Sequence, residues 1–126
     1  MLFPRKEEVL EIHAKLLEQF GGPPGIRDEG LLHSALMAAA HRQHYEGADL
    51  ATCAATYAFH LTRNHPFVDG NKRAGAAVAE IFVRLNGAQL AATNDEIVEL
   101  FLAIAAGTVT RDEVERVFTR WVVRPT

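Results

Sequence analysis

Apolar residues recur along this chain at the spacing of helices. Over residues 5–20 they return every three or four positions, which places them on one face of a helix. A second such run follows Asp28, a residue type that caps helix N-termini, and breaks at residues 43–47, which we interpret as a short connection. Towards the C-terminus the capping pattern Thr-x-x-Glu occurs at Thr93 and Thr110, so two more helices are predicted there.

Two segments in the middle of the chain are apolar on more than one side. The first covers about residues 48–64, and the second runs from Gly70 or Asn71 to Asn86-Gly87, a good helix terminator. Helices that are apolar all round are buried, so we expect these two at the centre. The pattern predicts an all-α fold, a compact single-domain bundle of about six helices over residues 1–126.

Composition supports a globular domain and narrows the class of partner. Hydrophobic residues make up 48% and charged residues 23% of the chain, the ordinary globular mixture, and 20 alanines favour closely packed helices. Thirteen basic against 16 acidic residues give a net charge of −3, which argues against a nucleic-acid surface or binding to an anionic membrane. The longest uncharged run, residues 50–62, is too short to span a bilayer.

Cysteine usage and the start of the chain indicate the compartment. The single cysteine, Cys53, cannot form an internal disulfide, and we expect it to be a small buried residue instead of a nucleophile. No apolar stretch preceded by positive charge marks a signal peptide, so we expect a cytoplasmic protein. No hairpin signal or internal repeat stands out, and residues 89–92 are too few to assign.

The segment that joins the two central helices, residues 65–73, reads His-Pro-Phe-Val-Asp-Gly-Asn-Lys-Arg. Pro66 disfavours the helical conformation at His65, so the third helix should end there. Asp-Gly is typical of a turn, and Lys72 and Arg73 then lie in the first turn of the next helix. Cations oppose the helix dipole at that position, whereas a bound anion would be stabilised by them and by the free amides.

Each of these residues has a plainer explanation when it is taken alone. A histidine before proline is usually a helix-end hydrogen-bonding group, Asp-Gly-Asn a turn, Lys-Arg a solvated pair and Phe67 a core anchor. Their conjunction within nine residues favours phosphoryl or nucleotidyl transfer, with His65 as general base and Asp69 as Mg²⁺ ligand. The free amides at this helix N-terminus, with Lys72 and Arg73 beside them, predict a phosphate site.

This segment resembles the motif of the Fic superfamily, His-x-Phe-x-(Asp or Glu)-Gly-Asn-(Gly or Lys)-Arg, with every fixed position matched. Nearly the whole chain further resembles the death-on-curing (Doc) toxins of type II toxin–antitoxin modules. The remaining matches are Gly21-Gly22-x-Pro24-Gly25-x-x-Asp28, Tyr45-Glu46, Asp49-Leu50, Asn86-Gly87 and Ala105-Ala106-Gly107. The resemblance implies the Fic/Doc fold, with the active-site loop between the two central helices.

The resemblance also implies a role for each motif residue. It implies that His65 deprotonates a target hydroxyl, that Asp69 binds Mg²⁺ and that Arg73 binds a phosphate of ATP. It implies an anion hole at Gly70 and Asn71. Most Fic enzymes use such a site to transfer AMP from ATP.

Two departures from the longer Fic motif are shared with Doc. Lys72 replaces a glycine, and Ala76 stands where AMP transferases often have a second arginine. This implies an inverted nucleotide and therefore a protein kinase that transfers the γ-phosphate to a threonine of elongation factor Tu and halts translation. The alternatives that remain open are an AMP transferase and a catalytically inactive nucleotide-binding homologue. An RNA-cleaving toxin is disfavoured by the acidic net charge, and a zinc site at His41 and His44 by the lack of further ligands.

Regulation and target alignment are implied in part. No inhibitory helix motif occurs in the chain, so the resemblance implies restraint by a cognate antitoxin whose disordered tail folds into an apolar groove. Residues 42–47 lie where Fic proteins carry a flap that aligns the target, with Tyr45 as either a flap residue or a packed aromatic. Arg63 and Asn64 lie beside the base and are either nucleotide contacts or helix-end polar groups.

Overall fold

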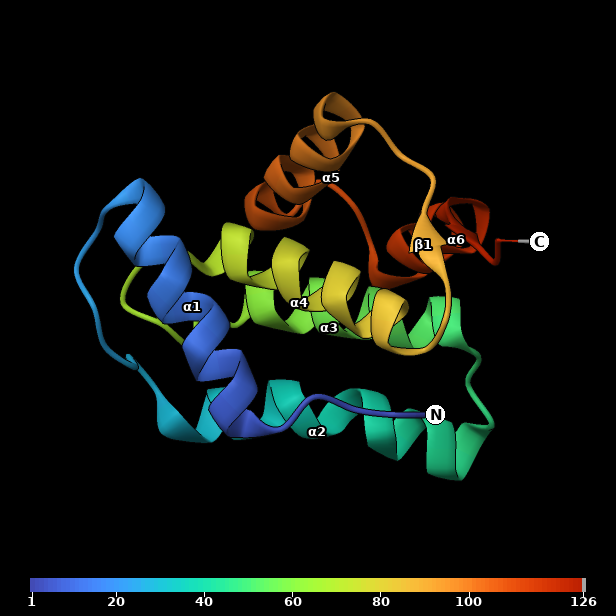
Figure 1. The fold of residues 1–126 in the computed structure, drawn as a ribbon, viewed down its shortest axis with the longest axis horizontal. Helices are drawn as coiled ribbons and strands as arrows, with labels where there is room; N and C mark the ends of the chain where they lie inside the picture. Colours follow the sequence, from blue (N-terminus) through green and yellow to red (C-terminus); the bar gives the residue numbers. More distant parts are fainter. Residues whose placement is uncertain (126) are drawn as a thin grey trace.

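The computed structural model describes residues 1–125, which form six helices and one short two-stranded ladder (Figure 1). In chain order the elements are α1 (Lys6–Phe20), α2 (Glu29–Glu46), α3 (Leu50–Arg63), α4 (Asn71–Leu85), β1 (Gln89–Leu90), α5 (Asn94–Ala106), α6 (Arg111–Trp121) and β2 (Val122–Val123). The predicted all-α fold is confirmed. Within residues 1–125 no helix has the length and apolar character that a membrane crossing requires.

Capping side chains begin most of the helices, with one informative exception. Asp28 accepts a hydrogen bond from the Leu31 amide, and Thr93 and Thr110 form the predicted capping boxes. Gly70 precedes α4 in the left-handed conformation, and no side chain within residues 1–125 caps this helix. The first amides of α4 are therefore left without a side-chain acceptor.

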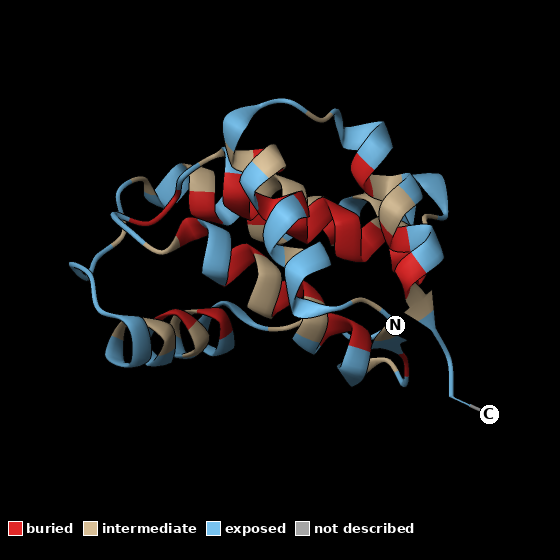
Figure 2. Cartoon of the chain, turned by 90° about the horizontal axis from the view of Figure 1, so that it is seen from above, coloured by how far each residue is buried: buried red, intermediate tan, exposed pale blue. Residues whose placement is uncertain are grey.

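The two central helices are α3 and α4, as the sequence predicted. Figure 1 shows α3 in the middle of the molecule, and its main packing partners are α2, α4 and α6. Buried residues concentrate on α3 and on the side of α4 that faces it (Figure 2). Many of the buried residues on these two helices are alanines, whose small side chains allow close packing: Ala51, Ala54, Ala55 and Ala58 of α3, and Ala74 and Ala79 of α4.

The cysteine lies inside this core. Cys53 is fully buried on α3, and its Sγ lies 3.6 Å from the Ala39 carbonyl oxygen. Burial raises the pKa of the Cys53 thiol to about 11, so the thiol stays protonated at neutral pH. The prediction of a small buried residue is confirmed.

The α2 helix is longer than the sequence pattern indicated. Residues 43–46 continue it, and it ends at Gly47, whose φ of +65° suits a left-handed C-cap. Arg42 ties this end to the bundle, because its guanidinium pairs with Glu115 of α6 and donates to the Thr56 hydroxyl at 3.1 Å. The connection predicted for this segment was wrong, since these tertiary contacts outweigh a weak apolar pattern.

The hypothesis of a flap at residues 42–47 is also wrong, because residues 42–46 belong to α2. The backbone there is helical and offers no extended edge to a target main chain. In Figure 1 this end of α2 lies across the bundle from the loop between α3 and α4. Tyr45 is 79% exposed and lies against the rings of His41 and His44, so the packed-aromatic interpretation is also wrong.

A short antiparallel ladder joins the end of α4 to the end of α6. Gln89 pairs with Val123, Leu90 pairs with Val122, and the Ala91 amide donates to the Trp121 carbonyl at 2.7 Å. Each strand has two residues, too few to show the alternation of apolar and polar positions that marks a strand. This is why residues 89–92 could not be assigned from the sequence.

The α3–α4 contact is closest at Gly75. A Cβ added there would lie 2.5 Å from Thr62 Oγ1 and 3.3 Å from the Ala58 carbonyl oxygen. The Thr62 hydroxyl is buried and has no hydrogen-bond partner among the described residues. Thr62 and Gly75 therefore set the helix separation just beside the loop that carries the motif.

We expect Gly75→Ala to lower the free energy of unfolding by about 1–2 kcal/mol, although alanine is the better helix former. The cause is overlap with the Thr62 hydroxyl, so the double variant Gly75→Ala/Thr62→Ala should recover most of the loss. Chemical denaturation of the four proteins in this cycle measures the coupling between the two sites. Gly30→Ala is the matched control, because its nearest neighbour lies at 3.4 Å. A stabilised Gly75→Ala protein, uncoupled from Thr62, would contradict the expectation.

Candidate active site

The loop of residues 64–70 begins with an unusual backbone conformation at His65. Its φ of +48° is the one left-handed value that a non-glycine residue adopts within residues 1–125. Arg27, in the loop between α1 and α2, stabilises this conformation. Its Nε donates to the His65 carbonyl at 2.6 Å and its Nη2 to the Asn64 carbonyl at 2.8 Å. The His65 side chain is exposed and lines a cavity of about 540 Å³. Strained backbone with an exposed imidazole is typical of a functional position.

The middle of the loop is fixed from two directions. Phe67 is 1% exposed, so its predicted role as a core anchor is confirmed. The Asn71 side chain clasps the Phe67 backbone, with its Oδ1 accepting from the Phe67 amide and its Nδ2 donating to the Phe67 carbonyl, both at 3.0 Å. On the other side, Ile26 forms a β-bridge with Phe67, and the Val68 amide donates to the Gly25 carbonyl at 3.0 Å.

These bonds define what Asn71 can contribute to an anion site. Both polar atoms of its side chain are used by the loop, and the residue is buried. The donors of Asn71 that remain for a bound anion are its backbone amide, at the first position of α4, and the second N–H of Nδ2.

Asp69 is exposed at the turn into α4. Its Oδ1 accepts a hydrogen bond from the Gly70 amide at 2.8 Å. Its Oδ2 lies directly against Gly22, in space that a Cβ at Gly22 would fill. Gly22, just after the end of α1, therefore makes room for the carboxylate.

The donor set around Asp69 fits Mg²⁺ carried by a nucleotide. Within residues 1–125 no three acidic, histidine or cysteine side chains gather into a metal site. Mg²⁺ commonly needs just one or two carboxylates, with phosphate oxygens and waters completing its shell. Asp69 supplies one carboxylate next to the open amides of α4, where phosphate would also bind.

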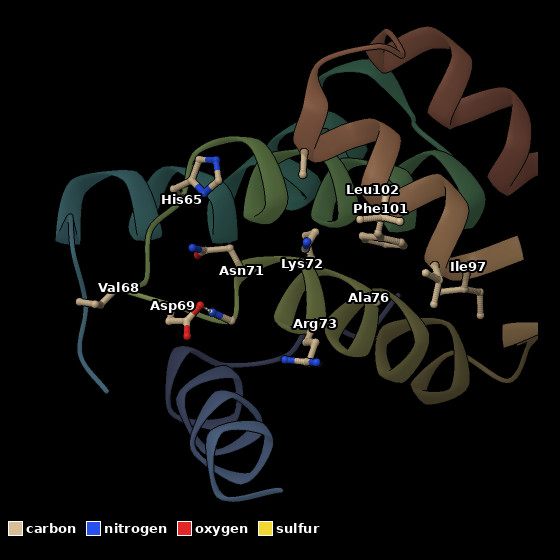
Figure 3. A pocket seen from close by; sticks show the side chains of 13 residues that line it. His65, Val68, Asp69, Asn71, Lys72, Arg73, Ala76, Ile97, Phe101 and Leu102 are labelled. Atoms are coloured by element: carbon tan, nitrogen blue, oxygen red, sulfur yellow. Dashed lines mark hydrogen bonds between the residues drawn. The ribbon is translucent and has the colours of Figure 1, made fainter. Parts of the chain in front are cut away.

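Lys72 and Arg73 lie on the first turn of α4, and both side chains are exposed. Figure 3 shows them leaving the helix on different sides, with Lys72 towards α5. The Arg73 guanidinium carbon lies 4.3 Å from the ring centroid of Phe20 at the end of α1, a cation–π contact. Neither Lys72 nor Arg73 forms an ion pair with a carboxylate of the described residues, so both side chains are available to bind an anion.

The motif opens into a cavity of about 540 Å³, in which His65, Asp69, Gly70, Asn71, Lys72 and Arg73 all take part (Figure 3). The structure thus brings together every residue that the sequence predicted for the site. Its opposite wall comes from α5 and is apolar, formed by Ile97, Val98, Phe101, Leu102 and Ala105. The sequence analysis expected an apolar groove but did not assign it to these residues. The available signal was Val98 and Leu102, apolar residues four apart that lie outside the buried face of that helix and are 56% and 51% exposed.

The other polar candidates do not join the cavity. His41 and His44 are exposed on α2, as the surface interpretation predicted. Arg63 donates to the Ile104 carbonyl at 3.4 Å, and the Asn64 carbonyl accepts from Arg27. Arg63 and Asn64 therefore serve as helix-end polar groups.

Comparison with known proteins agrees with this geometry. The family model described as Fic/DOC family matches residues 3–83, which include α1, the loop and most of α4. The chain belongs to the Fic/Doc family. "Protein kinase doc" of Escherichia phage P1 is 32% identical over 109 residues, 86% of each chain. "Toxin Doc" of Mycolicibacterium smegmatis (strain ATCC 700084 / mc(2)155) is 44% identical over 80 residues, 60% of each chain. The family model thus covers the loop and the helices on either side of it, whereas α5 and its apolar wall lie beyond residue 83, where that match ends.

Proposed function

We propose that this chain is the toxin of a toxin–antitoxin module and acts as a protein kinase. It transfers the γ-phosphate of ATP to a hydroxyl of a translation factor in the cytoplasm, with elongation factor Tu as the implied target. The observation that carries the proposal is the uncapped N-terminus of α4, with Lys72, Arg73 and Asp69 around it and His65 on the same cavity. The similarity to relatives named Doc supports it.

The residues divide the work of phosphoryl transfer. The neutral His65 imidazole accepts the proton of the attacking hydroxyl. Lys72, Arg73 and the first amides of α4 bind the phosphate oxygens and stabilise the charge that builds up on them. Asp69 would hold Mg²⁺, which supplies charge neutralisation at the phosphates.

Two features favour phosphate transfer over AMP transfer. Ala76, one turn after Lys72, lines the cavity with a methyl group where AMP transferases often place a second arginine. Lys72 occupies the position of a glycine and adds a side chain next to the phosphate site. Lys72 thus reduces the room, and Ala76 the positive charge, available for the AMP-transfer orientation of the nucleotide.

The apolar wall of α5 supports the proposed antitoxin partner. Val98 and Leu102 are exposed beside the active site, and Ile97 and Phe101 lie behind them. An apolar strip on a helix suits an amphipathic segment that folds on binding. We propose that the disordered tail of a cognate antitoxin docks here and covers the catalytic residues.

ATP labelled at either the α or the γ position tests the reaction. Incubated with elongation factor Tu and Mg²⁺, the protein should transfer the γ label and leave the α label in nucleotide. Transfer of the α label alone would overturn the kinase and establish an AMP transferase. Nucleotide binding with no transfer of either label would instead indicate an inactive homologue.

A further inference from the structure

His13 of α1 is a buried polar residue next to the active-site loop that the motif does not include. It is 5% exposed, and its Nε2 lies 2.8 Å from the backbone carbonyl oxygen of Asp69. Its ring stacks on Phe67 with centroids 3.7 Å apart and an interplanar angle of 9°. Since a carbonyl only accepts, the proton must reside on His13 Nε2, which then donates to Asp69.

The bond from His13 fixes the direction of one particular peptide. In the trans Asp69–Gly70 peptide, the carbonyl and the N–H point to opposite sides. With the carbonyl held towards His13, the Gly70 N–H points away from it and donates to Asp69 Oδ1 at 2.8 Å. One hydrogen bond therefore sets both the peptide plane and the position of the Asp69 carboxylate.

Among the described residues, His13 is the one hydrogen-bond partner of the Asp69 carbonyl. Gly70 has a φ of +79°, and glycine adopts positive and negative φ with similar ease, so local preference does not fix the plane. The side chains nearest to Gly70 are those of His13 and Leu17, and the Leu17 side chain has no polar group that could orient the peptide.

We propose that His13 is a positioning residue for the reaction. Its Nε2–H orients the Asp69–Gly70 peptide, and through it the Asp69 carboxylate and the entry into the anion-binding end of α4. The inference rests on the proposed function for its consequence in catalysis, but the peptide orientation itself can be observed without any reaction.

Variants at His13 separate hydrogen bonding from packing. His13→Leu keeps apolar bulk and loses the donor. His13→Gln places an amide N–H near the position of Nε2, whereas the shorter His13→Asn does not reach it. Val9→Ala, at a fully buried site one turn earlier on α1, is the control for loss of stability alone.

We expect His13→Leu and His13→Asn to lower kcat and to weaken Mg²⁺-dependent ATP binding by about 10–100-fold, as loss of support for a metal ligand does. His13→Gln should return both values to within about threefold of wild type, because its amide N–H can restore the hydrogen bond to the Asp69 carbonyl. A difference of about threefold corresponds to less than the roughly 1.4 kcal/mol of a tenfold change. In NMR spectra the Gly70 amide resonance should shift in the leucine and asparagine variants and return towards its wild-type position in the glutamine variant. Val9→Ala should unfold more easily with kcat unchanged.

The outcomes distinguish this proposal from the proposed function. Absence of transfer by the wild-type protein would count against the proposed function, and the Gly70 resonance and ATP binding would still decide the role of His13. The role of His13 is refuted if the leucine variant keeps the wild-type Gly70 resonance and binding, or if glutamine is as impaired as leucine. If His13→Leu does not fold, the comparison of the glutamine and asparagine amides gives the same decision.

Discussion

Replacing His65 by alanine is expected to lower the rate of transfer by about 10²–10⁴-fold, the usual contribution of a general base. The side chain is exposed on the cavity and makes no hydrogen bond with the described residues, so its removal leaves few packing contacts to lose. The cost to folding should be about 1 kcal/mol, because alanine fits the left-handed conformation at this position poorly. Initial rates with labelled ATP and a denaturation curve measure the two effects.

A second variant separates the base from the backbone strain. Asparagine tolerates left-handed φ but is no base at neutral pH, so His65→Asn should keep full stability and still lose the activity. His33→Ala, at an exposed histidine of α2, should change neither property. Undiminished transfer in either His65 variant would remove His65 from the mechanism.

The sequence was sufficient to locate the candidate active-site segment because the residues of that segment are neighbours in the chain. Residues 65–73 are consecutive, and Pro66 and Gly70 impose the helix end and the turn by themselves. The central place of α3 and α4 likewise followed from helices that are apolar all round. The net charge of −3 argued against binding of anionic ligands by the chain as a whole. The stretch from Arg63 to Arg84, however, holds four basic and two acidic residues, and this local positive charge is enough for a nucleotide-sized site.

What the sequence did not reveal depends on contacts between distant segments. Arg27 and His13 support the loop from the α1–α2 loop and from α1, and no local pattern in either segment announces a bond to residues 65–69. The end of α2 shows the same limit, since the partner that secures Arg42, Glu115, lies 73 positions further along the chain. Tertiary contacts of this kind override weak local preferences and cannot be read from spacing.

Removing the ring of Phe67 should strongly lower both stability and activity. Phe67→Ala deletes a side chain that is 1% exposed and stacked on His13, so we expect the free energy of unfolding to fall by about 3–5 kcal/mol. Activity should fall as well, because the ring holds the loop against α1 while Asn71 and Ile26 hold only its backbone. A misplacement of about 1 Å at the reacting groups is enough to lower a rate by about 10²-fold.

Phe118→Ala shows whether the loss of activity is specific to the loop. Phe118 is fully buried on α6, away from the motif, so its removal should cost a similar 3–5 kcal/mol. At a temperature where both variants are folded, Phe118→Ala should therefore keep the wild-type kcat, whereas Phe67→Ala should not. Equal activity in the two folded variants would mean that Phe67 stabilises the bundle without aligning the catalytic loop. An intermediate rate in Phe67→Leu, which restores apolar volume without the stacked ring, would assign part of the alignment to the contact with His13.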